Sequence, residues 1–336
     1  MDILADVLAV GGVRGTAGAR IEAGGTWGIS WDARCNAAFY AVTSGTAWLC
    51  LPGREAQQLM PGDVVLLPSG AEHALSSAPG VPLAPCGGCG GNAAMENGSV
   101  LRLGAGAVQT HILGASYEYD RTVSTQVMTS LPQVLHIRAD HGGNCLDDTV
   151  RLLSRELAYP QIATAFVLNR LVDILLVQLI RVWLAKHPDE ARDSWIGMLA
   201  DPVVSDALAK LHQEPARGWT INSLAAELTL SRSTLTRRFR AVTGTAPAEY
   251  LTRWRMDLAA IRLRDSDDPL DAIARSVGYT SVYAFSRAFR RARSQAPGQF
   301  RSAARATERG PARPQGLPPN EATTVIPAGL PRPPRE

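Results

Sequence analysis

Residues 224–239 read LAAELTLSRSTLTRRF, and residues 273–289 read IARSVGYTSVYAFSRAF. In both stretches apolar residues recur four positions apart, which places one apolar stripe on each of two short helices. A break of three or four residues separates the helices, and Gly278 supplies backbone freedom in the second copy. Ser231 and Ser281 stand where they can cap the following helix. The sequence therefore predicts a helix-turn-helix in duplicate.

Charge is distributed unevenly along the 336 residues. The whole chain carries +3 at pH 7, but residues 217–305 hold sixteen Arg, no Lys and seven acidic side chains, a net +9. Residues 1–216 hold fourteen basic and twenty-one acidic side chains, a net −7. Arg is the side chain best suited to phosphates and guanine edges. A basic region joined to an acidic one is the electrostatic footprint expected of a DNA-binding protein.

The segment 219–300 resembles the AraC/XylS family of bacterial transcription regulators. The resemblance rests on the Ala-Pro pair at 246–247, on Gly278 at the second turn and on the closing APGQF at 296–300. It implies two helix-turn-helix units joined by a long helix over 247–264, with recognition helices about 34 Å apart on one face of the duplex. The expected function is sequence-specific transcriptional regulation, with no enzymatic activity and no cofactor.

The resemblance assigns DNA-contacting residues position by position. The first recognition helix would present Ser231, Arg232, Ser233, Thr234, Arg237 and Arg238, and the second Thr280, Ser281, Val282, Tyr283, Ser286, Arg287 and Arg290. Side chains at the helix start, such as Arg232, reach base edges, whereas Arg238 and Arg290 lie further along and are expected to meet phosphates. For Tyr283, contact with a base or sugar and packing against the turn both stay open.

Residues 37–120 have a different pattern, in which Gly and Pro separate short apolar runs. The clearest runs are 38–42, 47–51 and 61–68. Such runs predict a small antiparallel barrel or sandwich. The sequences PGD at 61–63 and PSGAEH at 68–73 resemble the second half of a cupin motif, found in the sensory domain of one branch of the AraC family. The expected fold class is α+β: an N-terminal cupin-like β-barrel, a helical linker and a C-terminal all-α domain.

Composition and pattern divide the chain into four expected parts. These are a cupin-like sensory domain (1–125), a helical linker and dimerisation section (126–214), a double helix-turn-helix domain (215–305) and a disordered Pro- and Arg-rich tail (306–336).

Within the linker, 147–158 and 161–186 are periodic helical stretches. Predicted buried positions in the longer one are Val167, Leu171, Ile174, Leu175, Leu179 and Trp183. The same helix is a candidate dimer seam, and a homodimer is expected.

The barrel offers a candidate ligand pocket and a weak candidate metal site. Tyr40, Trp48 and His73 are the expected pocket residues. His73 is the one clear metal-ligand candidate, since His111 lies far along the chain. One imidazole does not make a metal site, so no metal is assigned and a metal-dependent cupin enzyme is disfavoured.

Five cysteines are present, and Cys86 and Cys89 form a C-x-x-C pair in a glycine-rich loop expected to be exposed. An odd number without a secretion signal argues against a disulfide framework. Three interpretations stay open. The first is a redox or electrophile switch, favoured by a resemblance to regulators that sense reactive chlorine. The second is a metal site completed by Cys35, Cys145 or a His, and the third is an insertion with incidental cysteines.

The chain shows no signal-peptide pattern, and its most apolar stretch, 166–184, is interrupted by charged residues. A cytoplasmic location without membrane contact is expected. The expected partners are promoter DNA, a second copy of the chain and RNA polymerase, with a small molecule or an oxidant as inducer. The alternative class is a nonspecific nucleoid-binding protein, which a low specificity ratio against competitor DNA would reveal.

Overall fold

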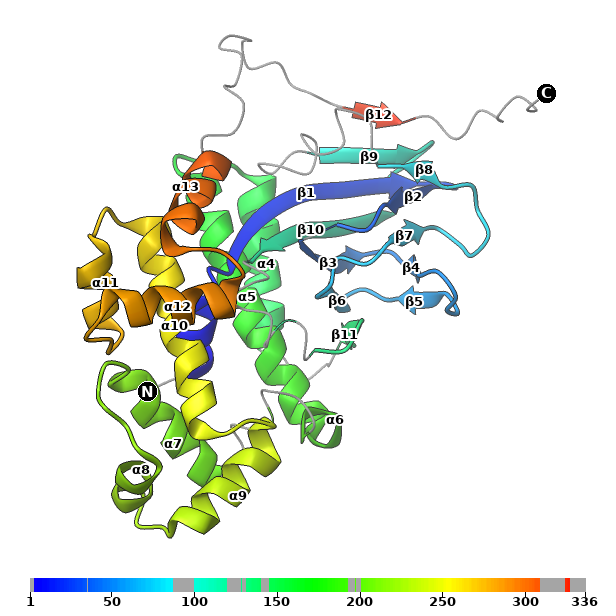
Figure 1. The fold of residues 1–336 in the computed structure, drawn as a ribbon. Helices are drawn as coiled ribbons and strands as arrows, with labels where there is room; N and C mark the ends of the chain where they lie inside the picture. The colour runs from blue at the N-terminus through cyan, green and yellow to red at the C-terminus, as the bar shows by residue number, and fades with distance from the viewer. Residues whose placement is uncertain are drawn as a thin grey trace, which may run out of the picture. The chain divides into compact units, whose positions relative to one another are not determined.

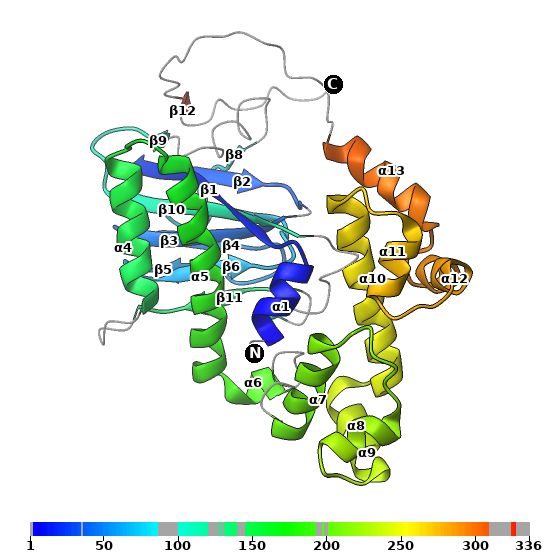
Figure 2. The ribbon, with the colours of Figure 1, turned by 90° about the vertical axis from the view of Figure 1, so that its left-hand side faces the viewer.

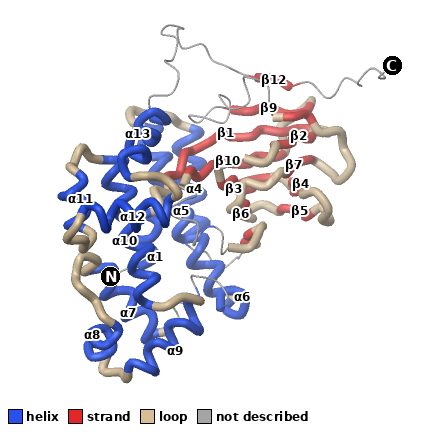
Figure 3. The backbone as a smooth tube through the Cα atoms, viewed as in Figure 1, coloured by secondary structure: helices blue, strands red, loops and turns tan. Residues whose placement is uncertain are grey.

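The chain forms two compact units that differ in secondary structure (Figures 1 and 3). The computed structural model describes residues 3–34, 36–86, 100–119, 128, 131–139, 145–192, 197, 201–308 and 324–326. One unit, here the β-sheet unit, takes in 14–119, 131–187 and 319–336. The other, the helical unit, takes in 1–13, 120–130 and 188–318.

The β-sheet unit holds two sheets. The larger has the strand order β11-β6-β3-β10-β1-β9-β12, with β11 Leu135–Ile137, β6 Val64–Leu67, β3 Ala37–Ser44, β10 Thr110–Glu118, β1 Arg14–Gly24, β9 Val100–Gly104 and β12 Thr324–Ile326. The smaller has the order β5-β4-β7-β2-β8, with β5 Gln57–Leu59, β4 Ala47–Cys50, β7 His73–Ser76, β2 Gly28–Trp31 and β8 Ala84–Pro85. The expected strands at 38–42, 47–51 and 61–68 are confirmed.

An apolar core lies between the two sheets. Ile21 and Val65 from the larger sheet meet Ile29, Leu49 and Leu75 from the smaller, and all five are fully buried. The mixed α+β class with a β-rich cupin region is confirmed. The described strands, however, form two packed sheets instead of the closed barrel that was expected. Alternation explains the packing of strands such as β2 and β4, because every second residue of each turns to the shared core.

Two helices cover the outer face of the larger sheet, α4 (Cys145–Ala158) and α5 (Thr164–Lys186) (Figure 2). They match the two predicted helical stretches. The phenol of Tyr117 donates to the carbonyl oxygen of Val172 at 2.8 Å, and the amide of Gly15 donates to Asp173 Oδ1 at 2.7 Å. A Cβ on Gly15 would lie 2.4 Å from the Val172 side chain, so only glycine allows β1 to approach α5 this closely.

Burial along α5 differs partly from the prediction. Leu175, Leu179 and Trp183 are buried as expected. Val167 and Ile174, also predicted inside, are 38% and 47% exposed. The apolar stripe of α5 is wider than the face that the sheet and α4 cover, which leaves apolar side chains outside.

The helical unit begins with α1 (Ile3–Val10) and continues after residue 187. Its further helices are α6 Pro188–Arg192, α7 Pro202–Gln213, α8 Ile221–Glu227, α9 Arg232–Thr243, α10 Pro247–Asp265, α11 Leu270–Ser276, α12 Val282–Arg293 and α13 Pro297–Glu308. Helices α8 and α9 form the first helix-turn-helix, and α11 and α12 form the second. The long joining helix expected over 247–264 is confirmed as α10.

Residues 1–13 group with the helical unit, although the expected sensory domain starts at residue 1. The reason is that α1 packs against α7 and α10. The four-part division of the chain otherwise stays a prediction. Among the described helices, none combines the length and the apolar character needed to cross a membrane.

Candidate nucleic-acid interface

The first recognition helix, α9, begins at a capped and exposed N-terminus. Ser231 Oγ accepts a hydrogen bond from the amide of Thr234 at 3.1 Å, as the sequence predicted. The side chains of Arg232 and Ser233 in the first turn are exposed, and Thr234 is half-buried. Leu235 and Phe239, on the opposite side of the helix, are fully buried. The helix therefore fixes its apolar side in the unit and leaves the start of its polar side accessible.

The second recognition helix, α12, has the same cap but a different first turn. Ser281 Oγ accepts from the amide of Ala284, and Val282 and Tyr283 are 38% and 71% exposed. The guanidinium carbon of Arg287 lies 5.8 Å from the centre of the Tyr283 ring. The half-buried Tyr279 instead packs edge-on against Phe285 in the turn. The packing alternative for Tyr283 is therefore wrong.

Arg238, expected at a phosphate, lies against an acidic partner. Its guanidinium donates to both carboxylate oxygens of Asp201, at 3.0 and 2.9 Å from Nη2. The same carboxylate caps α7 by accepting from the amides of Val203 and Val204. Burial acts to raise the pKa of Asp201, but the bonds from Arg238 and the two amides outweigh it and leave the pKa below its ordinary value. Arg238 thus braces α9 against α7.

The sixteen arginines of 217–305 fall into two groups. Seven form ion pairs within the unit, namely Arg217, Arg238, Arg262, Arg264, Arg275, Arg293 and Arg305. Arg255 and Arg301 donate to backbone carbonyls. The other seven are exposed and have no acidic partner among the residues that the structure describes: Arg232, Arg237, Arg240, Arg253, Arg287, Arg290 and Arg291.

Arg232 is the first residue of α9. Five of the other six lie beyond the first turn of the recognition helices, namely Arg237, Arg240, Arg287, Arg290 and Arg291. Arg240 and Arg253 were not among the DNA-contacting residues expected from the sequence. The spacing of Arg240, three positions after Arg237, is a helical-face signal that could have identified it. A partnerless guanidinium on an exposed helix is available to a phosphate, whereas a paired one must first give up its carboxylate.

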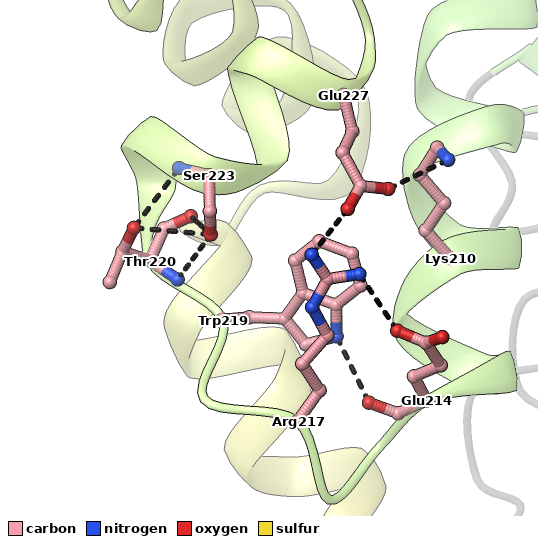
Figure 4. Close-up of polar contacts among 7 residues, drawn as sticks. All are labelled: Lys210, Glu214, Arg217, Trp219, Thr220, Ser223 and Glu227. Carbon is pink, nitrogen blue, oxygen red and sulfur yellow. Dashed lines mark hydrogen bonds and ion pairs between the residues drawn. The ribbon is translucent and has the colours of Figure 1, made fainter.

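The entry to the first helix-turn-helix is held by a polar network (Figure 4). Arg217 stacks on Trp219, with 4.1 Å from the guanidinium carbon to the ring centre, and bonds Glu214 at 2.8 Å and Glu227 at 2.5 Å. Lys210 on α7 forms an ion pair with Glu227, with 2.9 Å between Nζ and Oε2. These contacts tie the loop before α8 to both flanking helices.

A reciprocal capping box starts α8. Thr220 Oγ1 accepts from the amide of Ser223, and Ser223 Oγ accepts from the amide of Thr220, both at 3.0 Å. The two helix N-terminal amides are thereby satisfied without water.

An aromatic stack containing a histidine lies beneath the first helix-turn-helix. The imidazole of His212 on α7 lies parallel to Trp254 on α10, with ring centres 3.8 Å apart, and its Nε2 is 2.8 Å from the Tyr250 hydroxyl. His212 Nδ1 is 3.7 Å from a carboxylate oxygen of Asp6 on α1. Burial lowers the pKa of His212 to about 4, so the ring is neutral at pH 7. Tyr250 in turn packs edge-on against Phe239 of the recognition helix.

In the β-sheet unit, the structure brings together two of the three expected pocket residues. The Tyr40 hydroxyl lies 2.8 Å from His73 Nε2. His73 Nδ1 is 2.7 Å from the Ala71 carbonyl oxygen, which can only accept, so Nδ1 carries the proton and Nε2 accepts from Tyr40. Burial lowers the pKa of His73, consistent with a neutral ring. Trp31, which the sequence analysis missed, stacks on His73 with ring centres 5.1 Å apart.

Trp48 does not join this cluster. Its strand neighbours Ala47 and Leu49 point into the core, so Trp48 lies on the opposite face of β4. Trp31 faces His73 across the β2 and β7 pair and takes the place expected of Trp48. No group of three His, Cys, Asp or Glu able to hold a metal occurs among the described residues.

The predicted exposure of Cys86 is wrong, because this thiol is 6% exposed and belongs to the core. Its amide donates to the Ser30 carbonyl oxygen at 2.7 Å, which extends the pairing of β8 with β2 by one residue. Burial raises the pKa of the Cys86 thiol, with the nearby Arg34 acting in the opposite direction. Cys89 and Cys35 lie outside the described residues.

A duplicated helix-turn-helix with capped, exposed and Arg-rich recognition helices defines a DNA-binding transcription regulator. A cupin family model matches residues 2–185, and a helix-turn-helix domain model matches 224–303. The chain belongs to the AraC-like transcription regulators that carry an N-terminal cupin domain, and it binds double-stranded DNA.

Two relatives and one solved structure are similar to this chain. A putative AraC-like transcription regulator of Streptomyces lividans is 37% identical over 303 residues, which cover 90% of this chain and 98% of the relative. The RCS-specific HTH-type transcriptional activator RclR of Escherichia coli strain K12 is 27% identical over 310 residues, covering 91% and 99%. The DNA-binding domain of AdpA, the global transcriptional factor, in complex with a target DNA is 31% identical, covers 32% of this chain and 97% of that chain, and has a TM-score of 0.31.

Proposed function

We propose that this regulator reads promoter DNA differently with its two recognition helices. In α9, Arg232, Ser233 and Thr234 contact base edges by hydrogen bonding, and Arg237 and Arg240 hold phosphates. Arg240 takes the phosphate role expected of Arg238, because Arg238 is engaged with Asp201. The observation that carries this proposal is the division between paired and partnerless arginines.

The start of α12 supports readout of a more apolar kind. Thr280 offers a hydroxyl, Val282 an aliphatic side chain and Tyr283 an exposed phenol ring. The aliphatic side chain and the ring suit thymine methyls and sugar faces. Ser286 lies on the same helix, half-buried. Arg287, Arg290 and Arg291 follow and would hold phosphates.

The test is a fluorescence anisotropy titration of the full chain on its own upstream DNA, at fixed salt and with excess competitor DNA. Arg232→Ala should cost about 1 to 3 kcal/mol on the specific site and much less on scrambled DNA. Arg240→Ala, the matched control on the same helix, should weaken both DNAs alike. Equal loss on both DNAs for Arg232→Ala would contradict base readout, and no preference for upstream DNA at all would indicate nonspecific binding.

A homodimer is proposed from an exposed apolar patch. The patch, called the α4–α5 patch, consists of Leu152, Tyr159, Ile162, Phe166, Val167 and Ile174, which are 38% to 99% exposed. Apolar side chains exposed along two packed helices and in the turn that joins them are characteristic of an interface. Sedimentation velocity at micromolar protein measures the mass directly, and a monomer at all concentrations would refute the dimer. RNA polymerase is proposed as the further partner of the DNA-bound regulator.

Two hypotheses for the signal are carried forward, oxidation of Cys86 and Cys89 or binding of a small ligand. The name of the Escherichia coli relative supports the first. The burial of Cys86 and its raised thiol pKa weaken it, since the thiolate is the reactive form. The same DNA titration after stoichiometric hypochlorite decides the matter: a change in affinity that Cys86→Ser abolishes would establish the switch, and an unchanged isotherm would end it.

We also propose that the protein has no catalytic activity and that it acts in the cytoplasm, where bacterial promoters lie. The relatives are named as transcription regulators, which supports a non-enzymatic function. The Tyr40–His73 hydrogen bond supports it as well, because it occupies Nε2, the unprotonated ring nitrogen through which His73 could ligate a metal.

A further inference from the structure

A cavity lies on the outside of the sheet sandwich, between α4, the end of β3 and the turn before β6. Its volume is about 700 Å³, within the range of small-molecule sites in proteins. Every residue that lines it belongs to the β-sheet unit. It is separate from the core between the sheets, where Trp31, Tyr40 and His73 pack on one another and are at most 5% exposed.

The polar wall of the cavity carries net positive charge. Arg151 and Arg155 lie one helical turn apart on α4, and Asp147 is the one acid in the lining. Arg151 reaches Asp148 at 3.8 Å, but both side chains are about three-quarters exposed, and such a pair contributes little. Arg155 has no acidic partner among the described residues. The guanidinium of Arg155 is thus available to an anion entering the cavity, and Arg151 can join it by giving up a weak, exposed pair.

Part of the remaining wall is apolar. Pro61 and Val150 line it, and the ring of Tyr159 stands at the end of α4, whereas the side chain of Val42 belongs to the core between the sheets. Guanidinium groups favour a carboxylate geometrically, and the apolar wall favours a hydrocarbon portion attached to it. A phosphate alone would leave the apolar wall without a contact.

The floor of the cavity is held in place by a buried carboxylate. Asp63 accepts from the amide of Ala139 at 2.8 Å, from the amide of Met60 at 3.0 Å and from His136 Nε2 at 2.9 Å. Gln57 bonds the other nitrogen of His136 at 2.6 Å. Because Ala139 and the turn at 61–62 are fixed in this way, the cavity is preformed, which lowers the entropic cost of binding.

We propose that this cavity binds an amphipathic monocarboxylate, with the carboxylate at Arg151 and Arg155 and the hydrocarbon portion against Pro61, Val150 and Tyr159. The inference rests on the proposed function, since it assigns the ligand hypothesis for the signal to a place outside the sheet core. Tyr159 is shared by the cavity and the α4–α5 patch. A bound ligand therefore contacts the proposed dimer surface.

Isothermal titration calorimetry on the full chain tests the site with hexanoate, decanoate and phenylacetate as probes. Decyltrimethylammonium and inorganic phosphate serve as controls for charge sign and for the hydrocarbon portion. At least one carboxylate should bind once per chain, at least tenfold more tightly than either control. Arg155→Gln should weaken it at least tenfold, whereas the matched Arg54→Gln, an exposed arginine outside the cavity, should change it less than twofold.

Ser154→Trp provides a second variant, because the Ser154 hydroxyl bonds only its own helix and a large ring there fills the cavity. It should abolish binding without loss of helical circular dichroism. Absence of binding by all three carboxylates, equal binding of a control, or binding that survives both variants would overturn the inference. The DNA titration is run in parallel: specific DNA binding without carboxylate binding refutes this site alone, whereas absence of specific DNA binding refutes the proposed function.

Discussion

The two helix-turn-helix units of this regulator share one apolar plan and differ in their polar supports. Phe239 and Tyr250 meet edge-on in the first unit, with ring centres 5.9 Å apart, and Phe289 and Phe300 meet in the same way at 5.5 Å in the second. Ser231 and Ser281 cap the two recognition helices alike. The duplication therefore extends from the sequence pattern to the packing of the rings.

The polar connections of the first unit reach back to α7. Arg238 reaches Asp201 on α7, whereas the second unit has Ala288 at the matching position. Tyr250 bonds His212 on α7, whereas Phe300 has no hydroxyl to offer. The first unit thus depends on polar groups of α7, which precedes it in the chain, whereas the largely buried ion pair of Arg293 with Asp257 ties the second unit to α10. Substitutions in the two units should consequently differ in their dependence on pH and charge.

The largest expected effect comes from the turn of the second unit. Gly278 has φ +83°, and a Cβ there would lie 2.6 Å from the carbonyl oxygen of Ala216. Gly278→Ala should lower the free energy of unfolding by roughly 2 to 5 kcal/mol, because a left-handed backbone and a backbone clash add. Urea denaturation followed by far-ultraviolet circular dichroism measures the loss.

The matching turn of the first unit provides the control. Thr229 already adopts φ +55° with a full side chain. Thr229→Gly should change the free energy of unfolding by less than about 1 kcal/mol, since relief of strain and gain of unfolded-state entropy nearly cancel. Similar losses at the two turns would show that the left-handed conformation alone decides stability, without the close approach at Ala216.

Much of this comparison could be predicted from the sequence, and part of it could not. The repeated apolar spacing located both units and the caps at Ser231 and Ser281, because these features depend on residues within one or two helical turns. The partner of Arg238 could not be predicted, because Asp201 lies 37 positions away and an Arg on an exposed helix face looks the same with or without it. Trp48 was preferred to Trp31 for a similar reason, since strand register decides which face a side chain takes.

The second expected effect is a pH dependence that belongs to the first unit. The pKa of His212 is about 4 in the folded chain and about 6.5 when unfolded, so the unfolded state binds more protons between these values. Stability is therefore fully present above pH 6.5 and falls as the pH drops towards 4, by about 3 kcal/mol in total.

Urea denaturation at half-unit pH steps should show this loss in the natural chain and not in His212→Gln. Tyr250→Phe gives the first unit the ring pair of the second, and it should cost about 1 kcal/mol at pH 7 through the lost bond to His212. A His212 resonance that titrates near pH 6.5 in the folded protein would contradict the assignment.

The smallest of the three effects comes from Asp201, whose carboxylate both caps α7 and pairs with Arg238. One substitution distinguishes these two roles. Asp201→Asn keeps a side-chain oxygen for the amides of Val203 and Val204, since Asn caps helices as well as Asp does, but it removes the charge opposite Arg238. We expect a loss of about 1 kcal/mol at pH 7, modest because Arg238 is 42% exposed. The folded-state pKa of Asp201 is lowered, so its contribution is present at neutral pH and is lost as the pH falls through that lowered value, below the range in which His212 acts.

Arg238→Ala should give a loss similar to that of Asp201→Asn, and the double variant should lose little more than either single one. Additive losses in this double-mutant cycle would mean that the pair does not couple α9 to α7, and Arg238 would return to the group of arginines available to DNA phosphates.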